Sequence, residues 1–160
     1  ALGAAKQGEI LMAAKTAAQK GFHYIFEHYE MLAADDAQLR QTGLDHIAAF
    51  IQSERFVEIG RELTGMDDIV EADGQATPYI AGHYLTAHDD HQVARRRAAY
   101  VMGFTPAWRP EWGGQLQFFD DRGDVTRGYS PSYNTLTVSP CGSCMRCRRW
   151  RLSPADRDFR

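Results

Sequence analysis

Two spacings of apolar residues divide the chain into a helical part and a strand-rich part. In residues 8–20 and 44–65 apolar side chains recur at intervals of three and four residues. This spacing predicts two amphipathic helices, which end near Gly21 and Gly65 because glycine commonly stops a helix. Residues 22–32 lie between the helices and are rich in aromatic and β-branched residues, so we expect a strand there.

From residue 69 onward the apolar residues form short runs separated by glycine, proline and aspartate. We interpret six of these runs as strands: DIVEA, TPYIA, HYLTAHDD, RAAYVMGF, GQLQFF and NTLTV. Two longer loops connect them, TPAWRPEWGG and DDRGDVTRGYSPS. Six short strands in succession are typical of an antiparallel sandwich or barrel. The pattern therefore predicts an α+β protein in which N-terminal helices lead into a β-sandwich.

The size of the chain limits the number of domains. Its 160 residues suffice for one hydrophobic core but not for two independent ones. With 44% hydrophobic and 24% charged residues, the composition is that of a globular protein rather than a disordered one. We expect a single domain over residues 1–140, helical in 1–66 and strand-rich in 67–140, followed by a separate tail in 141–160.

Charge and hydropathy narrow the expected partners and location. No apolar run is long enough to cross a bilayer and no secretory signal is recognisable, so we expect a cytoplasmic protein without a membrane partner. Residues 1–140 carry 12 basic and 19 acidic side chains, whereas residues 141–160 carry six Arg and two Asp. The acidic body disfavours binding to nucleic-acid phosphates. The sequence does not indicate an oligomeric state.

His88 and Asp90 are the first candidate ligands for a metal ion. On a strand, residues i and i+2 point to the same face, so this imidazole and this carboxylate would lie side by side and both could bind one metal. The alternative is a surface pair on an edge strand. With six His and 21 acidic residues in the chain, such pairs also arise by chance.

Four segments of the sequence, taken in their order along the chain, support the interpretation of His88 and Asp90 as metal ligands. They are the G-x-[FY]-L-x-x-H-x-D run from Gly82 to Asp90, the arginines 95–97, the W-x-x-x-x-G-G-x-L run of 108–116 and the P-x-[FY]-N-x-L run of 131–136. Together they resemble the Fe(II)- and 2-oxoglutarate-dependent dioxygenases of the prolyl 4-hydroxylase type. The resemblance extends from about Tyr79 to about Val138 and is weaker before that.

The resemblance implies a fold, a reaction and a set of ligands. The fold is a double-stranded β-helix, also called a jelly roll and similar to cupins, with N-terminal helices packed on it. The implied cofactors are Fe(II), the cosubstrate 2-oxoglutarate and O2, with ascorbate as an accessory. The implied reaction hydroxylates a peptidyl proline, or a similar C–H group of a peptide or protein substrate, with succinate and CO2 as coproducts. His88 and Asp90 would be two of three iron ligands.

Two tyrosines have a weaker assignment. Tyr79 and Tyr84 correspond to positions where relatives carry aromatic residues near 2-oxoglutarate or the peptide groove. The resemblance therefore implies a cosubstrate or substrate role for them. The alternative is that they belong to the core, because an aromatic residue in a strand usually contributes to packing.

The third expected iron ligand, a histidine on a later strand, is missing. After Asp90 the sequence contains only His91, which follows directly on the same predicted strand. The tail contains all three cysteines of the chain, Cys141, Cys144 and Cys147, and neither valine nor isoleucine. Three interpretations remain open: a Cys cluster that binds zinc or an iron–sulfur cluster, an ordinary basic tail, and a tail translated out of frame.

The genetic code favours the third interpretation. Because Met145 has one codon, a one-base shift across Cys144 and Met145 encodes His or Tyr, and the shifted frame can encode H-A-V-x-x-V. We therefore expect residues 141–160 to pack poorly, the last strands to be missing and this chain to be inactive. The alternatives are a catalytically dead jelly-roll binding module and, less favoured, a Cys-cluster metal protein.

Overall fold

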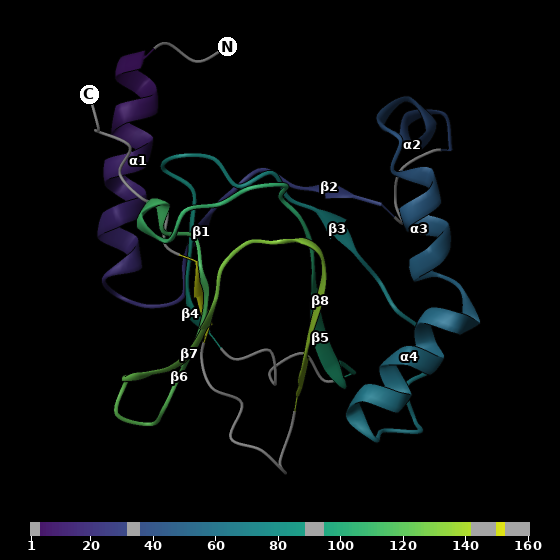
Figure 1. Cartoon of the computed structure of the whole chain (residues 1–160). Helices are drawn as coiled ribbons and strands as arrows, with labels where there is room; N and C mark the ends of the chain where they lie inside the picture. The colour runs from purple at the N-terminus through teal and green to yellow at the C-terminus, as the bar shows by residue number, and fades with distance from the viewer. Residues whose placement is uncertain (1–3, 32–35, 89–94, 142–149, 153–160) are drawn as a thin grey trace.

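Four helices flank antiparallel sheets in the computed structural model, which describes residues 4–31, 36–88, 95–141 and 150–152. Figure 1 shows α1 (Ala4–Ala18) on one side of the strands and α2 (Asp36–Thr42), α3 (Asp45–Ile51) and α4 (Glu54–Thr64) on the other. The expected α+β class, with helices packed on a jelly-roll type of fold, is confirmed.

The first predicted helix is observed as α1, which begins four residues earlier than expected and ends two residues before Lys20. The second is divided, because Ser53 has an extended backbone (ψ 149°) and starts a new helix, α4. Its Oγ accepts a hydrogen bond from the Phe56 amide at 3.3 Å, which satisfies one of the free donors of the first turn. Gly65, with a φ of 70°, ends α4 as expected. The short α2 was not predicted.

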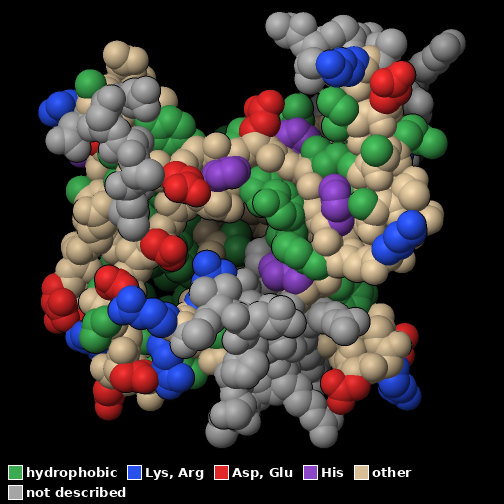
Figure 2. Space-filling view, turned by 180° about the vertical axis from the view of Figure 1, so that it is seen from behind, with side chains coloured by type: hydrophobic (Ala, Val, Ile, Leu, Met, Phe, Trp, Pro, Cys, Tyr) green, Lys and Arg blue, Asp and Glu red, His purple; other side chains and the backbone are tan. Residues whose placement is uncertain are grey.

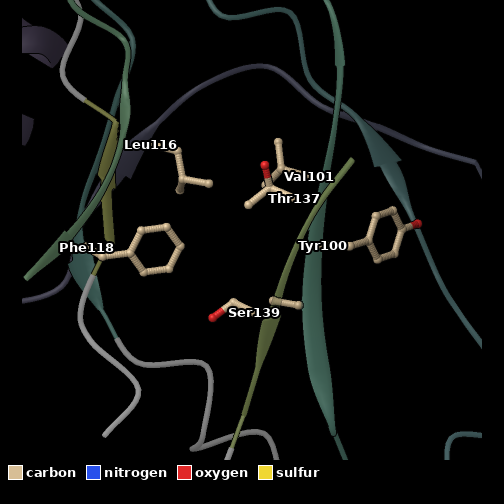
Figure 3. Close-up of a pocket in the computed structure, with 7 residues that line it drawn as sticks. Tyr100, Val101, Leu116, Phe118, Thr137 and Ser139 are labelled. Carbon is tan, nitrogen blue, oxygen red and sulfur yellow. The ribbon is translucent and has the colours of Figure 1, made fainter. Parts of the chain in front are cut away.

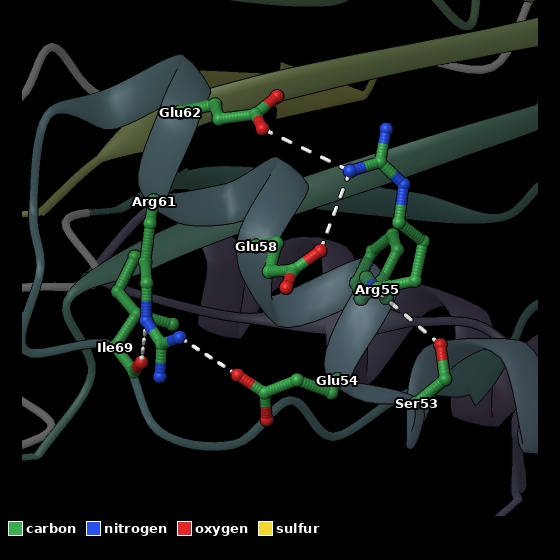
Figure 4. A network of polar contacts seen from close by, with 8 residues as sticks. Ser53, Glu54, Arg55, Glu58, Arg61, Glu62 and Ile69 are labelled. Carbon is green, nitrogen blue, oxygen red and sulfur yellow. Dashed lines mark hydrogen bonds and ion pairs between the residues drawn. The ribbon is translucent and has the colours of Figure 1, made fainter.

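Ion pairs form along α4, and a hydrogen bond from one of its side chains to a backbone carbonyl connects it to the segment that follows (Figure 4). Arg61 binds the Glu54 carboxylate at 2.8 Å and donates from Nε to the carbonyl oxygen of Ile69 at 2.7 Å. The predicted strand DIVEA contains Ile69, and this bond to α4 replaces a strand ladder there. The prediction of a strand in DIVEA was therefore wrong.

Three sets of strands form the β part. The five-stranded sheet has the order β1-β4-β9-β6-β7, while β2 pairs with β3 and β5 pairs with β8, all antiparallel. The bounds are β1 Tyr24–Ile25, β2 Tyr29–Glu30, β3 Gln75–Ala76, β4 Tyr84–His88, β5 Ala98–Phe104, β6 Leu116–Phe119, β7 Val125–Tyr129, β8 Tyr133–Pro140 and β9 Trp150–Leu152. Four of the six predicted strands are thus confirmed, as β4, β5, β6 and β8.

Two further predictions were wrong, one of a strand and one of a loop. TPYIA is not a strand: Pro78 has no amide hydrogen to donate, and the His83 amide closes a turn on the Ile80 carbonyl at 3.0 Å. The predicted loop DDRGDVTRGYSPS contains β7, whose side chains are all exposed and therefore show no apolar alternation. The turn before it is fixed by the Asp120 carboxylate, which accepts the amides of Arg122 and Asp124 at 2.9 and 3.0 Å.

The main hydrophobic core lies between the helices and one face of the β5–β8 pair. Its buried members are Met31, Leu39, Ala48, Ile51 and Phe56. Tyr100 and Met102 of β5 and Leu136 of β8 pack against them. Because side chains alternate along a strand, the other face of the β5–β8 pair is turned toward the five-stranded sheet.

The tail differs in part from its prediction. Its residues 150–152 form β9, which pairs with β4 on one side and with β6 on the other. Cys141 is 4% exposed, and its amide donates to the Arg97 carbonyl at 2.7 Å. We expected the tail to pack poorly and the last strands to be missing, but residues 150–152 form a strand and Cys141 is buried. Residues 142–149 and 153–160 lie outside the described residues.

Candidate functional site

A β-bulge sets the direction of His88 at the end of β4. Leu85 pairs with position 152 of β9 and His88 pairs with position 150, so two residues of β4 oppose a single residue of β9. Such a bulge reverses the alternation of side chains. Leu85, which is 6% exposed, and His88 therefore lie on the same face of the sheet.

The register across β9 shows that this is the inner face of the sandwich. Position 150 pairs with His88 on one side and with Phe118 of β6 on the other, so the three positions form one row. Figure 3 shows that Leu116 and Phe118 point from β6 toward the β5–β8 pair. His88 is thus presented toward the space between the two sheets, as expected for a ligand inside a jelly roll.

A small pocket lies between the sheets on this inner face. Its empty volume is about 240 Å³, part of which is open to solvent, and it is lined by Ala99, Tyr100, Val101, Leu116, Phe118, Thr137 and Ser139. The lining is mainly apolar, and the hydroxyls of Thr137 and Ser139 are its side-chain polar groups, since the Tyr100 ring points away (Figure 3). None of these lining residues is a cation that could pair with a carboxylate.

The hydrogen bond of His88 suits a metal ligand. Its Nδ1 lies 2.9 Å from the carbonyl oxygen of Thr86. A carbonyl oxygen only accepts, so Nδ1 carries the hydrogen, and a neutral imidazole then has its lone pair on Nε2. Binding of one ring nitrogen to a carbonyl is the usual way in which a protein orients a histidine that binds a metal through the other.

Thr86 itself is held by β1. Its hydroxyl accepts from the His23 amide at 2.8 Å and donates to the His23 carbonyl at 2.9 Å. The Thr86 amide donates to the same carbonyl at 3.0 Å. Residue 23, more than sixty residues earlier in the chain, therefore fixes the peptide group that orients the His88 ring.

The described residues contain one of the two expected iron ligands, His88. Its donor chemistry fits iron, whereas Asp90, the second expected ligand, lies outside the described residues. Within the described part of the chain there is no group of three or more His, Cys, Asp or Glu side chains able to hold a metal. The pairing of His88 with Asp90 therefore stays a prediction.

The two predicted tyrosines lie in different places. Tyr84 pairs with Ile25 of β1, which puts it on the opposite face of β4 from Leu85 and His88. Its hydroxyl lies 3.0 Å from Nδ1 of His23, and desolvation raises the pKa of this tyrosine. The structure thus does not bring Tyr84 together with His88.

Tyr79 precedes β4 and lies among rings. Its ring centroid is 5.5 Å from that of Phe26 and 6.4 Å from that of His83, and burial raises the pKa of its hydroxyl. Phe26 also contacts Tyr24, and Tyr24 contacts Phe22. The next contact is with His88, whose ring centroid lies 5.0 Å from that of Phe22.

Sequence reasoning did not single out Phe22, His23 or Tyr24 as site residues. The signal that was present is the alternation of aromatic residues at positions 22, 24 and 26, which places all three on one side of an extended chain. Their proximity to His88 was not visible, because it depends on the pairing of β1 with β4.

Comparisons with known proteins agree with this geometry. Residues 74–144 match the family model of the 2OG-Fe(II) oxygenase superfamily. This stretch is thus similar to the 2OG-Fe(II) oxygenases. It contains β4 with His88, the β5–β8 pair and the pocket between the sheets. The predicted enzyme class, a 2-oxoglutarate/Fe(II) dioxygenase by family, is thereby confirmed, and the family implies Fe(II), 2-oxoglutarate and O2.

The chain is also similar to a solved structure, the crystal structure of a prolyl-4-hydroxylase from Pseudomonas putida. The TM-score is 0.51 with 17% sequence identity, over 93% of this chain and 80% of that chain. This likeness shows a shared fold. No curated protein matches the chain.

Proposed function

We propose that this dioxygenase hydroxylates a peptidyl proline or a similar C–H group in a peptide or protein, with succinate and CO2 as coproducts. The observation that carries the proposal is the position of His88, which the bulge in β4 turns to the inner face of the sheet, the face on which Leu116 and Phe118 line the pocket. The resemblance of the sequence motifs to prolyl hydroxylases supports proline as the target.

The residues of this chain would bind and orient the reactants. His88 would hold the metal through Nε2, with its ring fixed by the Thr86 carbonyl. Leu116 and Phe118 would exclude water from the inner face, and the Thr137 and Ser139 hydroxyls offer hydrogen bonds to a polar ligand. Iron and 2-oxoglutarate, when bound, supply the oxidation of an unactivated C–H bond.

We further propose that the chain as written is inactive because its iron site lacks a second histidine. The strand beside β4 is β9, so residues of the tail occupy the sheet position next to His88. The sequence between Cys141 and β9 contains no histidine. A tail translated out of frame would explain this, since the shifted frame can encode a histidine near position 145.

The test compares two versions of the protein, one with residues 141–160 as written and one with the tail of the shifted frame. Each is incubated with Fe(II), 2-oxoglutarate and a proline-containing peptide, and succinate is measured. We expect succinate only from the second version, and none from its His88→Ala variant. Absence of succinate from both versions would favour the dead binding module. The coding nucleotides give an independent check, because a frame without a histidine codon near position 145 contradicts the frameshift.

The alternative Cys-cluster site depends on residues outside the described part. Cys141 is buried, with its thiol 3.9 Å from the Ser139 carbonyl, while Cys144 and Cys147 lie among residues 142–149. Metal analysis of a Cys144→Ser variant would separate this hypothesis from the iron site. If the substitution leaves the metal content unchanged, the cysteines are not ligands.

Location and partners remain predictions. We propose a cytoplasmic protein with a peptide or protein substrate and no nucleic-acid or membrane partner. In the described part of the chain, no helix has the length and apolar character needed to span a membrane.

A further inference from the structure

A continuous row of aromatic rings runs from His88 along the edge of the five-stranded sheet. We call Phe22, Tyr24, Phe26 and Tyr79 the aromatic strip. Successive ring centroids are 5.0 Å apart from His88 to Phe22, 5.7 Å from Phe22 to Tyr24, 4.9 Å from Tyr24 to Phe26 and 5.5 Å from Phe26 to Tyr79. The strip therefore connects two residues that the sequence motifs assign to the site, His88 and Tyr79.

The end of the strip near His88 is open to solvent. Phe22 is 58% exposed and Tyr24 is 49% exposed, although each contacts a neighbouring ring. Tyr24 lies in β1, which is at the edge of the sheet among the described strands, and Phe22 lies two residues before it in the chain. Figure 2 shows hydrophobic and His side chains gathered together on one face of the molecule. Exposed aromatic side chains that continue from a reaction site mark a surface where a ligand binds.

The strip has the dimensions and chemistry of a surface for an extended peptide. Rows of aromatic rings bind proline-rich segments, whose polyproline II conformation is formed in advance and costs little entropy to bind. Such a segment rises about 3.1 Å per residue, so each step between neighbouring rings spans slightly less than two residues. The three steps from His88 to Phe26 together correspond to about five residues of peptide.

Charged side chains at the far end of the strip favour a basic peptide. The ring of His28 lies 6.0 Å from that of Phe26, and the Glu30 carboxylate lies 3.7 Å from Nε2 of His28. A positive side chain about five residues from the target would thus meet the Glu30 carboxylate.

We propose that the aromatic strip binds the substrate as an extended, proline-containing segment with a basic residue about five positions from the residue at His88. Phe22 and Tyr24 are positioning residues for this segment. The proposal rests on the proposed function for the identity of the reacting residue, but binding itself requires neither iron nor 2-oxoglutarate.

The test is therefore a binding measurement on the full chain without metal or cosubstrate. The probe is a fluorescein-labelled peptide of twelve residues with alternating proline and alanine, in which one alanine five positions from the central proline is replaced by lysine. We expect Phe22→Ala and Tyr24→Ala each to raise the dissociation constant roughly five- to tenfold, as loss of an aromatic contact at a binding surface does. Tyr133→Ala is the matched control, because Tyr133 is an exposed ring (66%) on β8 outside the strip.

The charge of the peptide is tested separately. Glu30→Gln should weaken binding of the lysine probe roughly threefold and leave a probe with alanine at that position unaffected. Glu111→Gln, a change of an exposed carboxylate outside the strip, is the control. Melting curves of all variants verify that they fold, which we expect because the substituted side chains are exposed.

The outcomes separate this inference from the proposed function. In one outcome the probe binds, Phe22→Ala weakens this binding, and the version with the shifted tail forms no succinate. This outcome supports the strip and contradicts the enzymatic proposal. Succinate formation with binding that neither Phe22→Ala nor Tyr24→Ala changes overturns the strip. Equal binding of a glutamate-substituted probe contradicts the preference for a basic peptide. Binding of an oligosaccharide such as cellohexaose in place of the peptide also overturns the proposal.

Discussion

The two halves of the sandwich are built in different ways. The β5–β8 pair has seven residue pairs in its ladder, and one of its faces is covered by the helices around Ile51 and Phe56. The five-stranded sheet that carries His88 consists of strands of two to five residues, and its central position is taken by the three residues of β9. Its described buried side chains are Leu85 and Leu116.

Because of this difference, the larger core and the candidate site lie in different halves of the molecule. The helix-covered half forms its ladder and core from residues 31–140, whereas the half with His88 depends on a strand from the tail to join β4 to β6. A defect in the tail is therefore expected to damage the candidate site while the larger core remains folded. Local stability of this kind differs between regions of one protein and is measurable by hydrogen exchange.

The largest effect is expected in the helix-covered half. Ile51 is 2% exposed at the centre of the main core, so Ile51→Ala removes buried surface and leaves a cavity. We expect a loss of about 2–5 kcal/mol in the free energy of unfolding, measured by urea denaturation. Ile80→Ala is the matched control, because Ile80 is 56% exposed, and it should change stability by less than about 0.5 kcal/mol. Similar losses in both variants would show that Ile51 is not in the core.

A proline in β9 is expected to break the other half selectively. Arg151 lies in the middle of β9 between β4 and β6, and proline has no amide hydrogen for a ladder. Arg151→Pro should remove a ladder hydrogen bond, cost about 1–3 kcal/mol locally and raise the exchange rates of the Leu85 and Leu116 amides, with little change at Ile51. Arg151→Ala keeps the amide and serves as the control. If the amides of Leu85 and Leu116 exchange at the same rate in the proline and alanine variants, β9 does not join the sheet.

Sequence pattern predicted the fold where local signals and tertiary packing agree. Gly65 ends α4, and β4, β5, β6 and β8 lie within predicted runs, because their side chains meet a core on at least one face. The pattern failed at β7, whose side chains are all exposed, and at Ser53, whose capping bond divides a continuous apolar spacing. In both cases hydrogen bonds rather than burial determine the structure.

The same division applies to the candidate site. His88 was found because its neighbours along the chain form a motif, and the register places it on the expected inner face. The partners that orient it were not found, since His23 lies 63 residues from Thr86 in the sequence. The direction of His88 also depends on a bulge, which period-two alternation along β4 does not predict.

A smaller effect is expected where β1 joins β4. Thr86→Val keeps the shape of the side chain but removes the hydroxyl that binds both the amide and the carbonyl of His23. We expect a loss of about 1–2 kcal/mol in the free energy of unfolding and faster exchange of the His23 amide. Thr126→Val is the control, because the Thr126 hydroxyl makes one exposed bond, to the Phe118 carbonyl at 3.1 Å. Equal losses of stability in the two variants would mean that the hydrogen bonds between the Thr86 hydroxyl and the His23 backbone do not stabilise β1.

The smallest effect concerns Tyr100, on the helix-covered side, and depends on pH. The Tyr100 hydroxyl donates to the Asp73 carbonyl at 2.7 Å, and burial together with the Asp73 carboxylate raises its pKa from 10.0 to about 12. A raised pKa means that the folded state holds the proton more tightly than the unfolded state does. The stabilisation is therefore fully present below pH 10 and is lost as the pH rises through about 12.

Tyr100→Phe isolates this contribution because it retains the ring packed against Phe56 and removes only the hydroxyl. At pH 8 the wild type should be more stable than the variant by about 1 kcal/mol, the usual net value of one hydrogen bond. Urea denaturation between pH 8 and pH 12 should show this difference shrinking above pH 10, while phenolate absorbance shows one tyrosine titrating late. A difference that stays constant or grows toward pH 12 would mean that the phenolate is tolerated there. The β5–β8 face would then be more open to water than the buried cluster around Ile51 implies.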